Sequence, residues 1–235
     1  MRTLGILGGM SWESTALYYR LLNEGIRQRC GGLHSAPLVL HSVDFAAIAA
    51  QQRAGEWDAA GRQLAAAAGG LERAGAGALL LATNTMHKVA PTIAAGTRIP
   101  LLHIGDAIGR ALAADGWRRA LLLGTGFTMR EAFLRDYLHR RHGIEVLVPE
   151  TKARAEIDRV IFQELCLGRF TEAARAFYLE VLARGRKAGA EAAILGCTEI
   201  GLLLDGASSP LPLVDSAAEH VRMGLDWMLE AAGGS

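Results

Sequence analysis

The sequence has few cysteines, and their spacing excludes the common structural uses of that residue. Cys30, Cys166 and Cys197 are the three cysteines among 235 residues, and no two of them form a CxxC pair. An odd number of cysteines without a partnering His/Cys cluster argues against a disulfide framework and against a structural zinc site. We therefore expect neither disulfides nor a metal site.

The sequence also has no excess of either positive or negative charge. Lys and Arg number 25 and Asp and Glu number 24, giving a formal net charge of +1, and the two signs are interspersed. No basic stripe is present that would follow a phosphate backbone, so neither nucleic acid nor a membrane is expected as a partner.

Long hydrophobic runs are missing as well. No run of about 18 uncharged apolar residues occurs that would be typical of a membrane-spanning helix. The opening "MRTLGILGGMSWEST" contains an apolar stretch that is too short and too rich in glycine for a signal peptide. These absences lead us to expect a cytoplasmic protein.

Short leucine-rich or β-branched runs alternate with longer alanine-rich stretches along the chain. This βαβ pattern is typical of a parallel sheet with helices on both faces, and 51% hydrophobic residues can fill the cores it needs. The fold class predicted is therefore α/β. Strands are expected at 3–8, 37–43, 78–83, 100–104, 119–125, 145–149, 192–197 and 212–215, and helices at 12–29, 57–74, 105–115, 128–141, 170–188 and 216–231.

Several of the expected strands end in the same way. "LLLATNTMHK", "LLLGTGFTMR", "AILGCTEIG" and, more loosely, "GILGGMSWES" pass from apolar residues into small polar ones and then into a helix. This weak repetition predicts two related lobes, the first made of residues 1–103 and 210–235 and the second of residues 104–209. Ligands bind beyond the carboxyl ends of strands in open α/β sheets, so we expect the four polar turns to face a cleft between the lobes.

The first turn, Gly8 to Ser14, is rich in glycine and small hydroxyl residues. Its backbone amides would favour an anion, although GxGxxG is absent and a dinucleotide is not indicated. The alternative is a plain strand-to-helix turn with Ser11 as its N-cap.

The second turn places two hydroxyls, an amide and an imidazole in five positions. Helix capping explains one of these groups but not all four. We expect Asn84 and Thr85 to hydrogen-bond a small anion, with Thr83 directed at it from the strand tip. His87 is assigned a supporting role.

The third turn contains Cys197 at the last position of an expected strand. Although a free cysteine is usually an inert apolar residue, one that precedes a helix N-terminus can ionise below its ordinary pKa of about 8.5. Glu199 either orients a substrate ammonium group or is a favourable acid in the first helical turn. Cys30 and Cys166 lie in helical stretches and are interpreted as structural.

The fourth turn, "GTGFT" at 124–128, repeats the pattern with hydroxyls only. We interpret it as a site that positions an anion, in which Thr125 is the binding residue.

In combination these motifs resemble the aspartate/glutamate racemase family of amino-acid racemases that need no cofactor. The resemblance rests on the first glycine turn, "TNTMH" and "GCTEIG", and "GGMSWEST", "HSVDF" and "NTMHKVA" narrow it towards the aspartate racemase branch. It covers nearly the whole chain. It implies an isomerase independent of pyridoxal phosphate, with two pseudo-symmetric lobes, a small amino-acid substrate between them and a homodimeric state.

The resemblance also implies one acid/base residue on each side of the substrate Cα. These positions correspond to Thr83 and Cys197, but the family usually has cysteine at the first of them, in "CNT". A threonine hydroxyl is far too weak an acid to serve as a base, yet it can donate a proton. The hypothesis is therefore an asymmetric racemase in which Cys197 removes the α-proton of the L enantiomer and entry through Thr83 is slow.

Acidification of the Cα–H bond must then rest on hydrogen-bond donors, because no lysine has a context suited to a pyridoxal Schiff base. Donors around the substrate carboxylate would stabilise the developing negative charge. Against a second carboxylate the chain offers Gln52, with Arg53 as a less secure choice. The full set of expected substrate-binding residues is Met10, Gln52, Asn84, Thr85, Thr125, Thr198 and Glu199.

Two alternatives remain open at this stage. A single cysteine is also compatible with a related isomerase or decarboxylase that uses Cys197. The loss of the first cysteine also leaves open a non-catalytic protein that binds an acidic metabolite, although the thiol, amide and hydroxyls retained at matching strand ends favour an enzyme.

Overall fold

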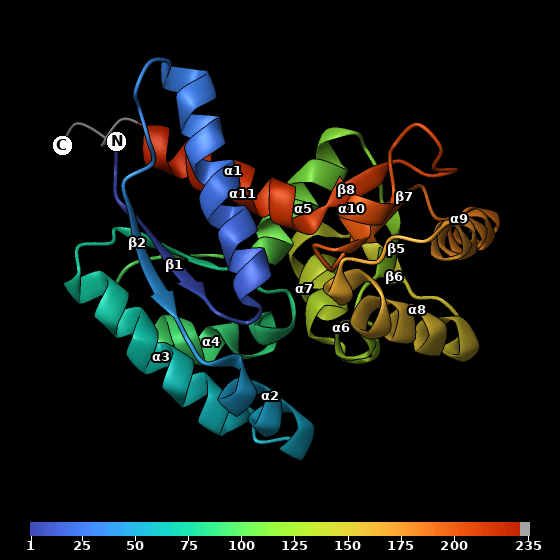
Figure 1. The fold of residues 1–235 in the computed structure, drawn as a ribbon, viewed down its shortest axis with the longest axis horizontal. Coiled ribbons are helices and arrows are strands. Elements are labelled where there is room, and N and C mark those ends of the chain that lie inside the picture. Colours follow the sequence, from blue (N-terminus) through green and yellow to red (C-terminus); the bar gives the residue numbers. More distant parts are fainter. Residues whose placement is uncertain (231–235) are drawn as a thin grey trace. The chain divides into compact units, whose positions relative to one another are not determined.

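Parallel β-sheets organise both halves of the chain in the computed structural model, which describes residues 1–230 (Figure 1). Unit 1 consists of Met1–Ile104 together with the segment that begins at His220, and unit 2 consists of Gly105–Glu219. Each unit has a four-stranded sheet, in the order β2-β1-β3-β4 in unit 1 and β6-β5-β7-β8 in unit 2. Every strand pair is parallel. The prediction of two similar α/β halves with parallel sheets is confirmed.

Unit 1 contains four strands, separated mainly by helices. In chain order the elements are β1 (Leu4–Gly8), α1 (Trp12–Cys30), β2 (Leu38–Ser42), α2 (Phe45–Ala54), α3 (Trp57–Arg73), β3 (Ala78–Leu81), the 3-10 helix η1 (Thr85–Val89), α4 (Ala90–Ala95) and β4 (Leu101–Leu102).

Unit 2 repeats this arrangement. Its elements are α5 (Ile104–Ala114), β5 (Arg119–Leu123), α6 (Gly126–Arg130), α7 (Phe133–His142), β6 (Glu145–Leu147), α8 (Thr151–Gln163), the 3-10 helix η2 (Leu165–Leu167), α9 (Glu172–Lys187), β7 (Ala192–Leu195), α10 (Ile200–Leu203) and β8 (Leu213–Asp215). Helix α11 (Ser216–Leu229) begins in unit 2 and continues into unit 1.

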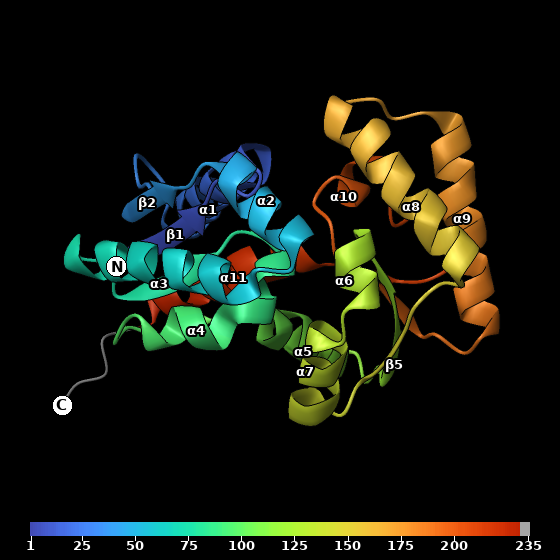
Figure 2. The same ribbon diagram turned by 90° about the horizontal axis from the view of Figure 1, so that it is seen from below.

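The central strands of unit 1 are covered on both faces. Every residue of β1 and β3 is buried, which is why both strands read as uninterrupted apolar runs. Helices α1 and α11 lie on one face of the sheet, and α3 and α4 lie on the other (Figures 1 and 2). Helices α1 and α11 approach closely, since a Cβ atom on Gly25 would lie 2.3 Å from Leu225 Cδ1.

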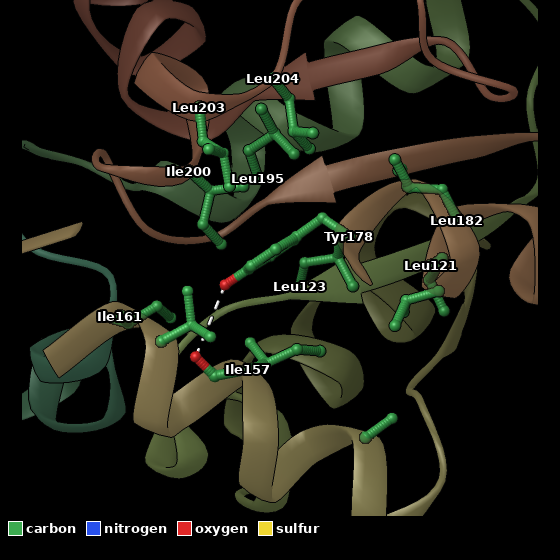
Figure 3. Close-up of a cluster of buried hydrophobic side chains, with 14 of the residues drawn as sticks. Leu121, Leu123, Ile157, Ile161, Tyr178, Leu182, Leu195, Ile200, Leu203 and Leu204 are labelled. Atoms are coloured by element: carbon green, nitrogen blue, oxygen red, sulfur yellow. Dashed lines mark hydrogen bonds between the residues drawn. The ribbon is translucent and has the colours of Figure 1, made fainter. Parts of the chain in front are cut away.

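A second core fills one face of the unit 2 sheet. Helices α8 and α9 lie side by side there (Figure 2). The ring of Tyr178 on α9 is packed among aliphatic side chains of α8, β5 and β7, and its hydroxyl group donates to the Ile157 carbonyl at 3.5 Å (Figure 3). The core behind the third and fourth turns is therefore almost entirely apolar.

Sequence reasoning placed the last strand in the wrong half of the protein. Residues 212–215 were expected to return to the first lobe, but β8 pairs with β7 through Val214 and Ile194. The chain re-enters unit 1 only at His220, inside α11, and not near residue 210. A hydrophobic pattern predicts a strand without naming its neighbour, which explains the error.

Several helices also differ from the prediction. Helices α2 and α8 were not predicted, although Asp44 caps the start of α2 and Gly55 ends it in a left-handed conformation. The helix expected at 128–141 is interrupted and forms α6 and α7. Strand β4 is only two residues long, and residue 231 of the last expected helix lies outside the described residues.

Candidate active site

The strand order creates one switch point in each sheet. In unit 1 the chain leaves β1 towards β2 on one side, and it leaves β3 towards β4 on the other side. In unit 2 the chain leaves β5 towards β6 and β7 towards β8 in the same divergent way. Ligands of open α/β sheets bind at the carboxyl ends of strands where such a reversal occurs. The four polar turns follow these four central strands, so the topology pairs the first turn with the second, and the third with the fourth.

The first turn is held mainly by its own side chains. Gly9 N–H donates to Thr15 Oγ1 at 2.8 Å, and Ser11 caps α1 by accepting from Ser14 N–H at 3.2 Å. Gly9 has φ of 92°, and a Cβ atom there would lie 2.3 Å from the Val43 carbonyl oxygen, so only glycine fits. Met10 has its side chain in the core and can offer a ligand only its backbone. The capping role of Ser11 is confirmed.

The second turn collects most of the expected binding residues of unit 1. Thr83 follows β3 and is half-buried, Asn84 is buried, and Thr85 begins η1. Gln52 of α2 joins this group, because its amide nitrogen lies 2.9 Å from the sulfur of Met86. Arg53, the other residue considered for a second carboxylate, is exposed.

The third turn has a compact polar cluster around one carboxylate oxygen. The Cys197 thiol donates to Glu199 Oε2 at 2.9 Å, and the Thr198 hydroxyl donates to the same oxygen at 2.7 Å. All three residues are half-buried. Glu199 therefore contacts the thiol directly, which goes beyond the two roles that the sequence suggested for it.

The expected activation of Cys197 by a helix N-terminus is wrong. Burial around the thiol and the negative charge of Glu199 raise the pKa of Cys197 well above its ordinary value. Helix α10 begins three residues later and is only four residues long, so it provides little dipole. The thiol is therefore neutral near pH 7 in this structure and needs a proton acceptor before it can act as a base.

The fourth turn is already engaged by the protein. Thr125 caps α6 by accepting from Thr128 N–H at 3.3 Å, and Gly126 N–H donates to the carboxylate of Asp158 at 2.5 Å. The Gly126 amide is thus occupied by a side chain of the protein itself. Binding of substrate by Thr125 stays a prediction.

Two acidic residues near these turns were not found from the sequence. Asp158 lies on α8, which the sequence analysis did not predict as a helix, and no local motif marks it. Asp215 is the last residue of β8 and caps α11 by accepting from the Ala217 amide. Its Oδ2 atom lies close to Gly201, because a Cβ atom added to Gly201 would be 2.7 Å from it. Burial raises the pKa of Asp215. An acid between a strand and a helix is a capping signal that could have indicated Asp215.

The remaining expectations concern metals, membranes and the other cysteines. Within residues 1–230 no group of three or more His, Cys, Asp or Glu residues is placed to hold a metal ion. None of the described helices is long and apolar enough to cross a membrane. Cys30 and Cys166 are both exposed, so neither contributes to a core as a structural cysteine would.

Comparison with known proteins agrees with this arrangement. Residues 7–224 match the family model described as Asp/Glu/Hydantoin racemase. A proposed Asp/Glu racemase from Yersinia pestis is 43% identical, with a TM-score of 0.94 over 98% of this chain and 100% of that one.

Two further solved structures extend the comparison. An aspartate racemase homologue from Pyrococcus horikoshii is 31% identical, with a TM-score of 0.87 over 97% of this chain and 99% of that one. A glutamate racemase from Francisella tularensis in complex with D-glutamate is 16% identical, with a TM-score of 0.65 over 97% of this chain and 81% of that one, and shares the fold. The match over nearly the whole chain, together with these two closer relatives, shows that the protein belongs to the Asp/Glu/Hydantoin racemase family.

Proposed function

We propose that the protein is a cofactor-independent racemase of acidic amino acids, acting on aspartate, glutamate or both. Cys197 and Thr83 are the two groups that exchange protons with the substrate Cα. The observation that carries the proposal is the hydrogen bond from the Cys197 thiol to Glu199, because it gives a buried thiol a proton acceptor at 2.9 Å. The family membership of the chain supports the same class of reaction.

Glu199 provides the route by which Cys197 becomes a base. The thiol proton passes along the existing hydrogen bond to Glu199 Oε2, leaving a thiolate and a neutral carboxylic acid. The thiolate then removes the α-proton of the substrate and becomes a thiol again, and Glu199 releases the proton it took to solvent, which restores the starting state. A substrate ammonium group near Glu199 would favour the thiolate, since a nearby positive charge lowers the pKa of a thiol.

Thr83 serves as the proton donor on the opposite face of Cα. Its hydroxyl is far too weakly acidic to ionise near neutral pH, but a carbanion is a strong enough base to take a proton from it. Solvent then returns the proton to Thr83. The pair is unequal because one member can be ionised by a neighbouring carboxylate and the other cannot.

Hydrogen-bond donors stabilise the negative charge that develops on the substrate carboxylate. We assign this role to Asn84 and Thr85 in unit 1 and to Thr125 and Thr198 in unit 2. The Thr198 hydroxyl has a single proton, so it must turn from Glu199 Oε2 to the substrate to fill this role. Removing one preorganised donor of this kind typically costs about 2.7–4 kcal/mol of transition-state stabilisation. Gln52 is assigned to the second carboxylate of the substrate, because it lies beside the second turn.

The asymmetry of the pair affects kcat and KM for the two enantiomers but not the ratio kcat/KM. The two enantiomers have equal free energy in water, so kcat/KM must be the same in both directions. Unequal proton-transfer groups therefore show up in kcat and KM separately, and not in their ratio. We expect a higher kcat and a higher KM for the L enantiomer, whose α-proton Cys197 removes.

The activity itself is tested with Cys197→Ser. The wild-type protein is expected to racemise L-aspartate or L-glutamate, as followed by circular dichroism, without added cofactor. The variant should lose at least about 100-fold in kcat, the lower range for general acid–base groups. Cys30→Ser is the matched control, because Cys30 is exposed and lies in the other unit. A fully active Cys197→Ser protein would refute the mechanism, and binding without turnover by the wild type would favour a non-catalytic relative.

The inequality of the two groups is tested with Thr83→Cys. A second thiol gives this position an ionisable base, so kcat from the D enantiomer is expected to rise towards kcat from the L enantiomer. Thr83→Ser keeps the hydroxyl and should leave the difference between the enantiomers unchanged. Progress curves from each pure enantiomer at saturation measure both values. An unchanged ratio of kcat values in Thr83→Cys would contradict the assignment of Thr83.

The role of Glu199 is tested with Glu199→Gln. Loss of the negative charge should lower the pKa of Cys197, so alkylation by iodoacetamide is expected to begin at lower pH than in the wild type. Racemisation should nevertheless slow, because glutamine cannot accept the thiol proton. An alkylation profile that does not move, or an unchanged kcat near neutral pH, would show that Glu199 is not the partner of Cys197.

A further inference from the structure

His87 is buried and joins two segments of unit 1 that are far apart in sequence. Its Nδ1 atom lies 2.8 Å from the carbonyl oxygen of Thr83, and its Nε2 atom accepts the Ile104 amide at 3.1 Å. The side chain is 2% exposed. A single imidazole thus links the backbone at the proposed proton donor to the first residue of α5.

These two hydrogen bonds are possible for only one form of the ring. A backbone N–H can only donate, so Nε2 must carry a lone pair and no proton. A carbonyl oxygen can only accept, so Nδ1 must carry the proton. His87 is therefore neutral and protonated at Nδ1.

Neighbouring groups support the neutral form. Burial lowers the pKa of His87 well below its ordinary value, and the nearby His103 and His220 rings add to the effect. The ring centroids of these neighbours lie 4.6 Å and 5.6 Å from that of His87. Burial also lowers the pKa of His220, to about 4.

His220 forms a second link of the same kind. Its Nε2 atom donates to the Leu102 carbonyl at 2.7 Å, and its Nδ1 atom accepts from the Tyr18 hydroxyl at 3.0 Å. The chain leaves unit 1 after Ile104 and re-enters it at His220. Both points at which the chain changes unit are therefore anchored by neutral histidines beside the second turn.

We propose that His87 is a positioning residue for Thr83, acting through the Nδ1–H tautomer that ties the Thr83 carbonyl to the Ile104 amide. Threonine is β-branched and has few side-chain rotamers, so the direction of its hydroxyl follows the position of its backbone. Releasing the Thr83 carbonyl lets this peptide rotate and moves the hydroxyl away from its working position. The proposal rests on the proposed function, because it assumes that Thr83 delivers a proton to the substrate.

Three substitutions separate the two hydrogen bonds of His87. His87→Asn places an amide N–H near the position of Nδ1 and keeps a donor for Thr83. His87→Gln places an amide oxygen near the position of Nε2 and keeps only an acceptor for Ile104. His87→Phe removes both groups, and His34→Asn is an exposed control in the same unit.

Misplacement of a reacting group by about 1 Å can cost about 100-fold in rate, and a loss of that size in kcat is expected for His87→Gln and His87→Phe. His87→Asn should retain clearly more activity than either. Alkylation of Cys197 in unit 2 should keep its wild-type pH profile in every variant. Equal losses in the Asn and Gln variants, or a wild-type kcat in a folded Phe variant, would overturn the proposal.

A second measurement does not depend on activity. Nitrogen NMR of histidine-labelled wild-type protein, with His87 assigned from the variants, should show a protonated Nδ1 and an unprotonated Nε2. The opposite tautomer or a charged ring would overturn the proposal even if the variants were unstable. If the wild type shows the expected tautomer but racemises no amino acid, the proposed function fails while the link between Thr83 and Ile104 stands.

Discussion

The parallel pairing of the strands is the constraint on which the rest of this structure depends. Each pair of neighbouring parallel strands needs a crossover connection, and here the crossovers after the two central strands of each sheet leave in opposite directions. The two carboxyl ends between them are left uncovered by helices, and the chain fills them with polar turns. Thr83 and Cys197 each stand at such an end, one in each unit. The chemistry proposed for them is a consequence of where these sheets allow polar groups to lie.

The fold could be predicted largely because buried parallel strands are conspicuous. Uninterrupted runs such as those of β3 and β7 are fully buried, and no other common element combines that composition with that length. Strand pairing was harder, because the apolar pattern of β8 is equally compatible with either sheet. Helix α8 was missed because it is not a conspicuous apolar run. Its polar residues outnumber its buried ones, and its buried face is defined by packing against η2, α6 and α9, which the sequence does not show.

The placement of the candidate residues just after strand ends was predictable, but their electrostatics were not. The strand ends marked Thr83, Asn84 and Cys197, since small polar residues after an apolar run have few structural uses. The state of the thiol could not be read in this way. Whether Cys197 is ionised depends on its burial and on the side-chain conformation of Glu199 two residues later, and both raise the thiol pKa where sequence reasoning expected a decrease. A carboxylate beside a thiol has opposite effects as a charge and as a proton acceptor, and only geometry shows that both operate.

The central claim is that two different groups, one a thiol and the other a hydroxyl, exchange protons with opposite faces of one Cα. The most direct test is the isotopic content of both enantiomers during the first turnovers of unlabelled L-aspartate or L-glutamate in deuterium oxide. Because the thiol holds the proton it removes while Thr83 delivers a solvent-derived one, the product D enantiomer should carry deuterium and the recovered L enantiomer should retain protium. Protium in the product would mean that a single group serves both faces and would contradict the account.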